Sequence, residues 1–178
     1  MDEPRLYTIG HSTRSAEELV ALLAQQHIAL LVDVRSMPGS RRHPQFNSDA
    51  LAESLAEAGI AYRHEKALGG RRKPQPDSEN DGWKHPAFRA YADHLQGKEF
   101  QQALAVVLAD AAERPTAVMC AEALPWRCHR WLIADAATVR GYQVTHIMGA
   151  GKTQPHKMTT FARVEGQRLT YPFALTSD

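Results

Sequence analysis

Short apolar runs alternate with amphipathic stretches along most of this chain, and the alternation predicts strands that alternate with helices. The runs that predict strands cover residues 6–9, 29–32, 60–62, 116–119 and 143–148. Leucine and alanine at helical spacing predict helices that begin near Ser15, Ser48, His85 and Trp131. This order predicts a three-layer α/β domain with a mostly parallel sheet of about five strands flanked by helices, of the Rossmann-like or flavodoxin-like class.

Polar residues and glycines predict where the first two helices begin and end. Ser15 followed three residues later by Glu18 predicts a capping box at the first helix. Ser48 or Asp49 is expected to cap the second helix, and Gly59 to stop it.

The second half of the chain contains a long helical region over residues 85–113, which is expected to break near Gly97. A tail over residues 157–178 follows the last predicted strand, and residues 162–171 within it predict a small hairpin. The total of 178 residues suits a single α/β domain over residues 1–178.

Composition excludes several classes of protein. The chain is 43% hydrophobic and 23% charged, as in ordinary soluble globular proteins. Its longest apolar run, residues 29–32, is too short to span a membrane, so no membrane partner is expected. The first residues lack a basic segment followed by an apolar one, which predicts no secretory signal and a cytoplasmic location. Cys120 and Cys128 are too few for a disulfide framework and are expected to be reduced there.

The formal net charge of +1 does not by itself predict a polyanion partner. Basic residues nevertheless gather in three segments, over residues 35–43, 63–73 and 127–130, whereas many acidic residues lie in the predicted helices. A nearly neutral total can therefore hide a positive face.

Ionisable and polar residues follow the carboxyl ends of the predicted strands, which is where parallel α/β sheets bind their ligands. From these positions we expect catalytic residues to be Cys128, His11, Asp33 and Glu122. We expect substrate-binding residues to be Ser12, Arg35, Ser40, Arg41, Cys120, His129, Arg130 and His146. No metal ligand is assigned, and no motif in the sequence identifies a cofactor.

Cys128 has three interpretations. At a helix N-terminus beside cationic side chains, its thiol would have a lowered pKa and could act as a nucleophile. It could instead bind a metal together with Cys120, His129 or His11, although the spacing of the two cysteines matches no standard zinc motif. It could also be a small buried residue that packs a helix start, and Cys120 is more typical of that structural role.

The charged candidates also carry alternatives. Arg35 and Arg130 are expected to bind phosphate or another anion, because guanidinium groups match such oxygens. Asp33 and Glu122 could transfer protons or hold basic residues in place. His11 is a candidate for proton transfer or for a structural hydrogen bond, and His146 is another.

Five motifs together resemble the domain-of-unknown-function family numbered 488. They are Thr8-Ile9-Gly10-His11-Ser12, Asp33-Val34-Arg35-Ser36-x-Pro38-x-Ser40-Arg41, Leu68-Gly69-Gly70, Cys120-Ala-Glu122-x-x-Pro125-x-x-Cys128-His129-Arg130 and His146-Ile147. The resemblance extends over about residues 7–156. It implies a cytoplasmic bacterial or archaeal α/β protein whose motifs gather at one site, and it implies no particular reaction.

Three function hypotheses follow. The first is a thiol-dependent enzyme, a hydrolase or transferase, that acts on an anionic substrate containing phosphate or a nucleotide through Cys128. The second is a nucleic-acid-binding or base-processing module, in which Trp83, Trp126 or Trp131 would stack on a base. The third is a metal-binding protein that uses Cys120 and Cys128.

Overall fold

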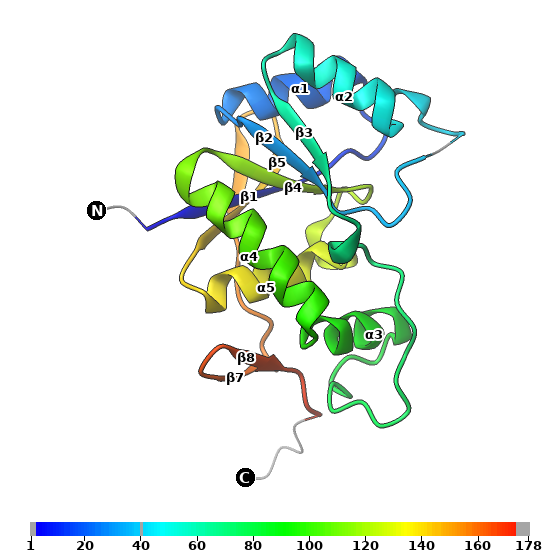
Figure 1. Cartoon of the computed structure of the whole chain (residues 1–178), viewed down its shortest axis with the longest axis vertical. Coiled ribbons are helices and arrows are strands. Elements are labelled where there is room, and N and C mark those ends of the chain that lie inside the picture. Colours follow the sequence, from blue (N-terminus) through cyan, green and yellow to red (C-terminus); the bar gives the residue numbers. More distant parts are fainter. Residues whose placement is uncertain (1–2, 40, 174–178) are drawn as a thin grey trace.

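The computed structural model describes residues 3–39 and 41–173. Its main sheet contains β1 Arg5–Gly10, β2 Leu30–Asp33, β3 Ala61–His64, β4 Thr116–Cys120, β5 Gln143–Gly149 and β6 Lys152–Pro155. The helices are α1 Ala16–Gln25, α2 Ser48–Glu57, α3 Pro86–Leu95, α4 Lys98–Glu113 and α5 Arg130–Val139. Figure 1 shows α1 and α2 on one side of the sheet and α3, α4 and α5 on the other.

The six strands lie in the order β3-β2-β4-β1-β5-β6, and the first five are parallel. The expected α/β class with a mostly parallel sheet is therefore confirmed. In both common doubly wound orders β1 and β2 are neighbours, whereas here β4 separates them. As a result, the carboxyl end of β4 lies between the ends of β1 and β2, and the loops after three strands meet.

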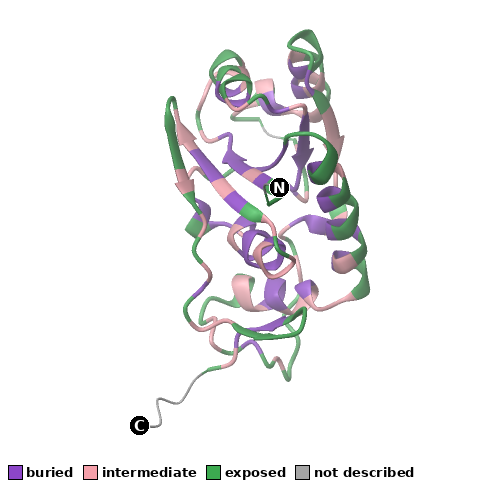
Figure 2. Cartoon of the chain, turned by 90° about the vertical axis from the view of Figure 1, so that its left-hand side faces the viewer, coloured by how far each residue is buried: buried purple, intermediate pink, exposed green. Residues whose placement is uncertain are grey.

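Two apolar clusters hold the helices against opposite faces of the sheet. One cluster joins α1 and α2 to residues such as Ile9, Leu31 and Met119. The other joins α3, α4 and α5 to the opposite side chains of the same strands, for example Val32 and Val118. Buried residues follow the strands and the inward faces of the helices, while the outward faces are exposed (Figure 2). β2 and β4 are buried along their whole length, which explains their continuous apolar sequence.

Several sequence-based expectations for helix ends are confirmed. The Ser15 side chain accepts a hydrogen bond from the Glu18 backbone, and the Glu18 side chain accepts one from the Ser15 backbone, so the capping box is present. The long helical region breaks at Gly97, which is the N-cap of α4. The tail forms a hairpin of β7 Arg163–Glu165 and β8 Arg168–Thr170.

Other expectations need correction. The N-cap of α2 is Asn47, because its backbone is extended while Ser48 is already helical. The third strand begins one residue later than expected and continues to His64. The edge strand β6 was not expected, since its polar sequence lacks the apolar run of a buried strand. In the described ranges, no helix is both long enough and apolar enough to cross a membrane.

Candidate functional site

A cavity of about 390 Å³ opens beside the carboxyl ends of β2 and β4 and the start of α5. Its lining comes from four segments that are far apart in the sequence. The lining residues are Arg35, Ser36, Met37, Gly70, Arg71, His85, Ala87, Phe88, Cys120, Ala121, Glu122, Arg127, Cys128 and His129. Both cysteines therefore face the same hollow, at the edge of the sheet where ligands are expected.

Gly10 lets the loop after β4 cross the end of β1. The backbone N–H groups of His11 and Ser12 donate to the carbonyls of Cys120 and Ala121, each at 3.0 Å, so the two chains remain paired beyond the strands. A Cβ atom at Gly10 would lie 1.8 Å from the carbonyl oxygen of Glu122. Only glycine fits this crossing, which gives the first sequence motif a steric reason.

Cys128 follows the 3₁₀ turn η3 Pro125–Arg127 and lies just before α5. Its Sγ accepts the backbone N–H of Arg130 at 3.4 Å and lies 3.4 Å from Nδ1 of His129. Burial by itself would raise the pKa of the Cys128 thiol. Hydrogen bonds from Cys120 and from the Arg130 backbone, together with the charge of Arg130, outweigh burial and lower that pKa below its ordinary value.

His129 is oriented by its second ring nitrogen. Nε2 lies 2.9 Å from the carbonyl oxygen of Val34, which can only accept, so Nε2 carries the proton. Burial is the main cause that lowers the pKa of His129, and a neutral ring then has its lone pair on Nδ1, facing Cys128. Gly70 packs against this ring, because a Cβ atom there would lie 2.6 Å from Nδ1. The histidine is therefore held as an acceptor for the thiol proton.

Arg130 is a fully buried cation beside Cys128. Nη1 donates to Thr8 Oγ1 at 2.9 Å, and Nη2 donates to the carbonyls of Glu122 and Ala123 at 3.0 and 3.4 Å. Within residues 3–39 and 41–173, no carboxylate forms an ion pair with it. A buried charge without a counter-ion is costly, so a negative group next to this guanidinium is strongly favoured.

Arg35 is neutralised by Asp33. The guanidinium binds both carboxylate oxygens, at 2.8 and 2.7 Å, and also donates to the carbonyl of Phe46 at 2.7 Å. The hydroxyl of Tyr62 donates to the same carboxylate at 2.6 Å, and this bond and burial raise the pKa of Tyr62 to about 12. Arg35 still lines the cavity, but Asp33 is fully buried and does not.

His11 is enclosed between Ser12 and Arg35. Its Nδ1 lies 2.9 Å from the carbonyl oxygen of Ser12, and its Nε2 lies 3.4 Å from Nη1 of Arg35. The ring stacks on Phe46 with the centroids 4.4 Å apart. Burial lowers the pKa of His11 to about 4, and the charge of Arg35 contributes, so the ring is neutral and both its nitrogens have partners.

The other expected site residues divide between the cavity and its surroundings. Cys120 and Glu122 line the cavity; burial raises the pKa of Cys120 far above its ordinary value, whereas the side chain of Glu122 is exposed. Arg41 is exposed and outside the lining, and His146 is fully buried beneath Trp131. Ser12 borders His11 in a left-handed backbone conformation, with φ at 50°. Ser40 lies outside the described residues.

Several lining residues were missing from the expected set. The backbone N–H of Arg71 donates to Ser36 Oγ at 2.9 Å, which joins two loops at the cavity wall. Arg71 and Arg127 belong to the basic segments noted in the sequence, and that clustering was the only signal that could have selected them. His85 and Phe88 come from the start of α3, a long sequence distance from the cysteines, and no local pattern indicated them.

The metal hypothesis lacks a ligand set. Among the described residues, no group of three or more His, Cys, Asp or Glu side chains is arranged to hold a metal ion. Cys120 and Cys128 lie close together, but the two histidines have other partners. Nε2 of His129 is hydrogen-bonded to the Val34 carbonyl, and the two ring nitrogens of His11 contact Ser12 and Arg35.

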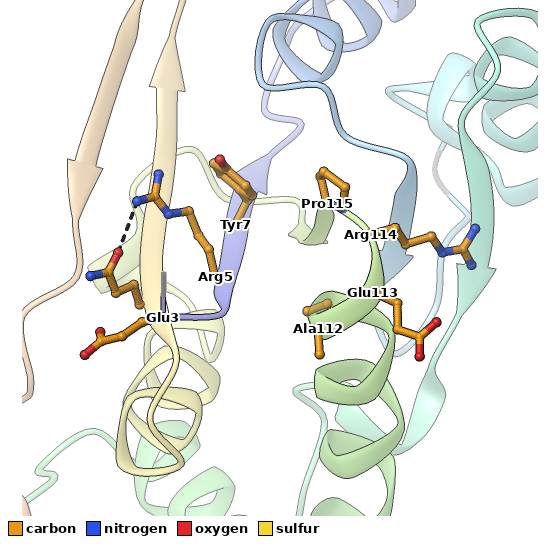
Figure 3. A pocket seen from close by; sticks show the side chains of 9 residues that line it. Glu3, Arg5, Tyr7, Ala112, Glu113, Arg114 and Pro115 are labelled. Atoms are coloured by element: carbon orange, nitrogen blue, oxygen red, sulfur yellow. Dashed lines mark hydrogen bonds between the residues drawn. The ribbon is translucent and has the colours of Figure 1, made fainter. Parts of the chain in front are cut away.

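A larger hollow of about 660 Å³ lies at the opposite edge of the sheet (Figure 3). It is lined by Glu3, Arg5, Tyr7, Ala111, Ala112, Glu113, Arg114, Pro115 and Gln143. Arg5 of β1 lies beside Gln143 of the neighbouring strand β5 and donates a hydrogen bond of 3.0 Å to it. The lining contains no cysteine, histidine or serine, so the cavity beside Cys128 is the better candidate for chemistry.

Comparison with known proteins gives one match. The family described as Domain of unknown function DUF488 matches residues 15–137, a range that includes Cys120, Cys128 and Arg130. The motifs around His11 and His146 lie outside this range. No curated protein and no solved structure matches the chain.

Proposed function

The chain belongs to the family described as Domain of unknown function DUF488, and from that premise we propose that it is a thiol-dependent enzyme with Cys128 as its nucleophile. Its substrate is anionic and contains phosphate or a nucleotide. The reaction class is hydrolysis or group transfer. Sγ forms a bond to the transferred group while the bond to the leaving group breaks and the leaving group departs with the thiol proton; water or an acceptor then takes the group from sulfur and restores the thiol.

The observation that carries this proposal is the pairing of Cys128 with a buried cation that has no carboxylate partner among residues 3–39 and 41–173. Arg130 is fully buried, and its hydrogen-bond acceptors are neutral oxygens. The ionised form of the neighbouring Cys128 supplies the missing negative charge. The Arg130 backbone N–H adds a hydrogen bond to the same sulfur, as expected at a helix N-terminus.

His129 provides the path for the thiol proton. Its Nδ1 lone pair faces Cys128 Sγ at 3.4 Å, a contact length suited to a thiol donor. Because Val34 keeps Nε2 protonated, the ring accepts the proton on Nδ1 and can return it to a leaving group from the same side. Cys128 and His129 thus form an adjacent nucleophile and base.

The cavity lining supports an anionic substrate with an apolar portion. Arg71 and Arg127 are exposed cations in this lining, and Arg35 contributes a third guanidinium that Asp33 holds in place. Met37 and Phe88 supply apolar surface in the same hollow. Guanidinium groups suit phosphate oxygens, and a volume near 390 Å³ is within the size range of small-molecule sites.

Activity screening with matched variants tests the proposal. Phosphate monoesters and nucleotides would be incubated with the wild-type protein and with the Cys128→Ser and Cys120→Ser variants. We expect turnover of at least one substrate and a loss of at least about a thousandfold in Cys128→Ser. Cys120→Ser keeps a hydroxyl that can donate to Cys128, so we expect it to lose far less activity. Turnover that survives in Cys128→Ser would contradict the assignment of the nucleophile.

One observation favours nucleic-acid binding as a second candidate function. Trp126 is 46% exposed and directly precedes Arg127, which lines the cavity, so an exposed aromatic side chain and a cation are neighbours in the chain. Such pairs bind single-stranded nucleic acids by stacking and charge. This function predicts affinity that falls steeply with salt and does not change in Cys128→Ser, and binding titrations with a labelled oligonucleotide measure both properties.

A further inference from the structure

A row of buried polar side chains leads from Arg130 into the core. Arg130 Nη1 donates to Thr8 Oγ1 at 2.9 Å, and Thr8 Oγ1 lies 2.6 Å from His146 Nδ1. His146 Nε2 lies 2.9 Å from His156 Nδ1, and His156 Nε2 lies 2.7 Å from Asp135 Oδ1. All five side chains are at most 1% exposed, and none lines the cavity.

With both rings neutral, the chemistry of the two ends gives every hydrogen bond in the row the same direction. The carboxylate of Asp135 can only accept, so His156 carries its proton on Nε2 and accepts on Nδ1. His146 must then donate from Nε2, and its Nδ1 accepts the hydroxyl proton of Thr8. Thr8 is left with an oxygen lone pair for Arg130, which can only donate. The row thus runs from a cation to an anion through three neutral groups.

The rings in this row are held in place by their surroundings. The indole of Trp131 stacks on His146 at an interplanar angle of 12° and meets the edge of His156. Asp135 also accepts hydrogen bonds from the Thr159 backbone, the Thr159 hydroxyl and the Tyr171 hydroxyl, at 3.1, 2.6 and 2.8 Å. Both nitrogens of each ring and both oxygens of Asp135 therefore have partners, whereas Nε of Arg130 has none among the described residues. A buried network that is satisfied in this way is rigid and can fix the position of the group at its end.

We propose that Asp135, His156 and His146 are positioning residues that act through Thr8 to hold the Arg130 guanidinium beside Cys128. The proposal rests on the proposed function, in which Arg130 stabilises the thiolate. Because the Thr8 proton is committed to His146, the Thr8 oxygen always accepts from Arg130. The carbonyls of Glu122 and Ala123 bind the other amino group, so the guanidinium is fixed from two sides.

The first test identifies the protons on the two rings. Nitrogen NMR of isotope-labelled protein distinguishes the two neutral tautomers of histidine from imidazolium. We expect a neutral His146 with its proton on Nε2, and a proton on Nε2 of His156 that faces Asp135. Imidazolium or the Nδ1–H tautomer at either ring would overturn the order of hydrogen bonds and with it the positioning role.

The second test breaks the row at Thr8. Thr8→Val keeps the branched shape and removes the hydroxyl, whereas Thr8→Ser restores the hydroxyl. On a Cys120→Ser background, we expect alkylation of Cys128 by iodoacetamide at pH 7 to slow at least about tenfold in Thr8→Val and to stay within about twofold in Thr8→Ser. Asp135→Asn keeps the shape of the buried side chain and is expected to slow the reaction as well. An unchanged rate in either folded variant, Thr8→Val or Asp135→Asn, overturns the proposal.

The two tests separate this proposal from the proposed function. A wild-type Cys128 that reacts like an ordinary thiol at pH 7 would overturn the proposed function, and the positioning role with it, whatever the ring protons are. If wild-type Cys128 is reactive but its alkylation rate does not change in Thr8→Val, the positioning role alone would be overturned.

Discussion

At the scale of single residues, the contacts of Cys128 decide where its proton goes. The sulfur receives one backbone N–H, faces the lone pair of a neutral imidazole and lies beside a buried guanidinium. The backbone N–H and the guanidinium favour loss of the thiol proton, and the imidazole nitrogen is placed to accept it. The neighbouring Cys120 has the opposite character, since burial raises the pKa of its thiol. The two cysteines therefore differ in reactivity although both line one cavity.

Gly70→Ala tests the placement of His129. The new methyl group would lie 2.6 Å from Nδ1, so the ring has to move away from Cys128. We expect alkylation of Cys128 to slow at least about tenfold, with little change in folding. Gly39→Ala is the matched control in the neighbouring loop, because nothing lies within 4 Å of its new Cβ. A Gly70→Ala variant as reactive as Gly39→Ala would contradict the role of His129.

Asp33→Asn tests the buried ion pair with Arg35. The substitution leaves a buried guanidinium without its carboxylate, and we expect the free energy of unfolding to fall by about 3 kcal/mol. Asp110→Asn removes a carboxylate from the half-buried pair with Arg63, at 2.8 Å, and is expected to cost at most about 1 kcal/mol. Urea unfolding measures both. Equal losses in the two variants would show that burial of the pair is not the cause.

The sequence predicted the types of the site residues better than their roles. Cys128, His129 and Arg130 were expected together because they share one short motif. The roles depend on partners that come from elsewhere in the chain, such as Val34 for His129 and Thr8 for Arg130. Side-chain hydrogen bonds between distant segments leave no local pattern, so His85, Phe88 and the buried row behind Arg130 were not foreseen.

At the scale of elements, capping and glycine signals were reliable because their physics is local. The capping box at Ser15 and the break at Gly97 need only neighbouring residues, and both are present. The β6 strand was missed because it owes its existence to pairing with β5 rather than to its own composition.

Ser15→Ala tests the capping box. It removes the acceptor of the 3.1 Å hydrogen bond from the Glu18 backbone, and we expect a loss of about 1 kcal/mol in the free energy of unfolding. Ser54→Ala makes the same substitution inside α2, where alanine is the better helix former, and should be neutral or slightly stabilising. Thermal unfolding of both variants measures the difference, and a stable Ser15→Ala variant would contradict the capping role.

At the scale of the whole molecule, the position of β4 between β1 and β2 brings the site together. Sequence alternation predicted the parallel sheet, but strand order depends on which loops and helices can pack across the sheet. That information is spread over the whole chain. The sequence could therefore place His11, Arg35 and Cys120 at one edge of the sheet, but it could not show that they are neighbours there.

Stability of the whole molecule is expected to fall as the pH is lowered below about 6.5. Burial lowers the pKa of His11 to about 4 and that of His146 to about 3, with charges on Arg35 and Arg130 contributing, so the unfolded chain binds protons that the folded chain does not. Each histidine contributes a slope of up to about 1.4 kcal/mol per pH unit between its folded value and its unfolded value of 6.5. Urea unfolding at pH 7 and pH 5 measures the loss. His11→Asn should flatten the profile.

The central claim is that the surroundings of Cys128 lower the pKa of its thiol, and a titration of its ultraviolet absorbance against pH tests this most directly. The Cys120→Ser variant isolates the signal of Cys128, and Cys128→Ser supplies the blank. We predict an apparent pKa for Cys128 clearly below the ordinary thiol value of about 8.5. The serine hydroxyl can still donate in place of the Cys120 thiol, and the backbone N–H and the charge of Arg130 also stabilise the thiolate. An apparent pKa at or above about 8.5 would contradict the claim and remove the basis for nucleophilic catalysis by Cys128.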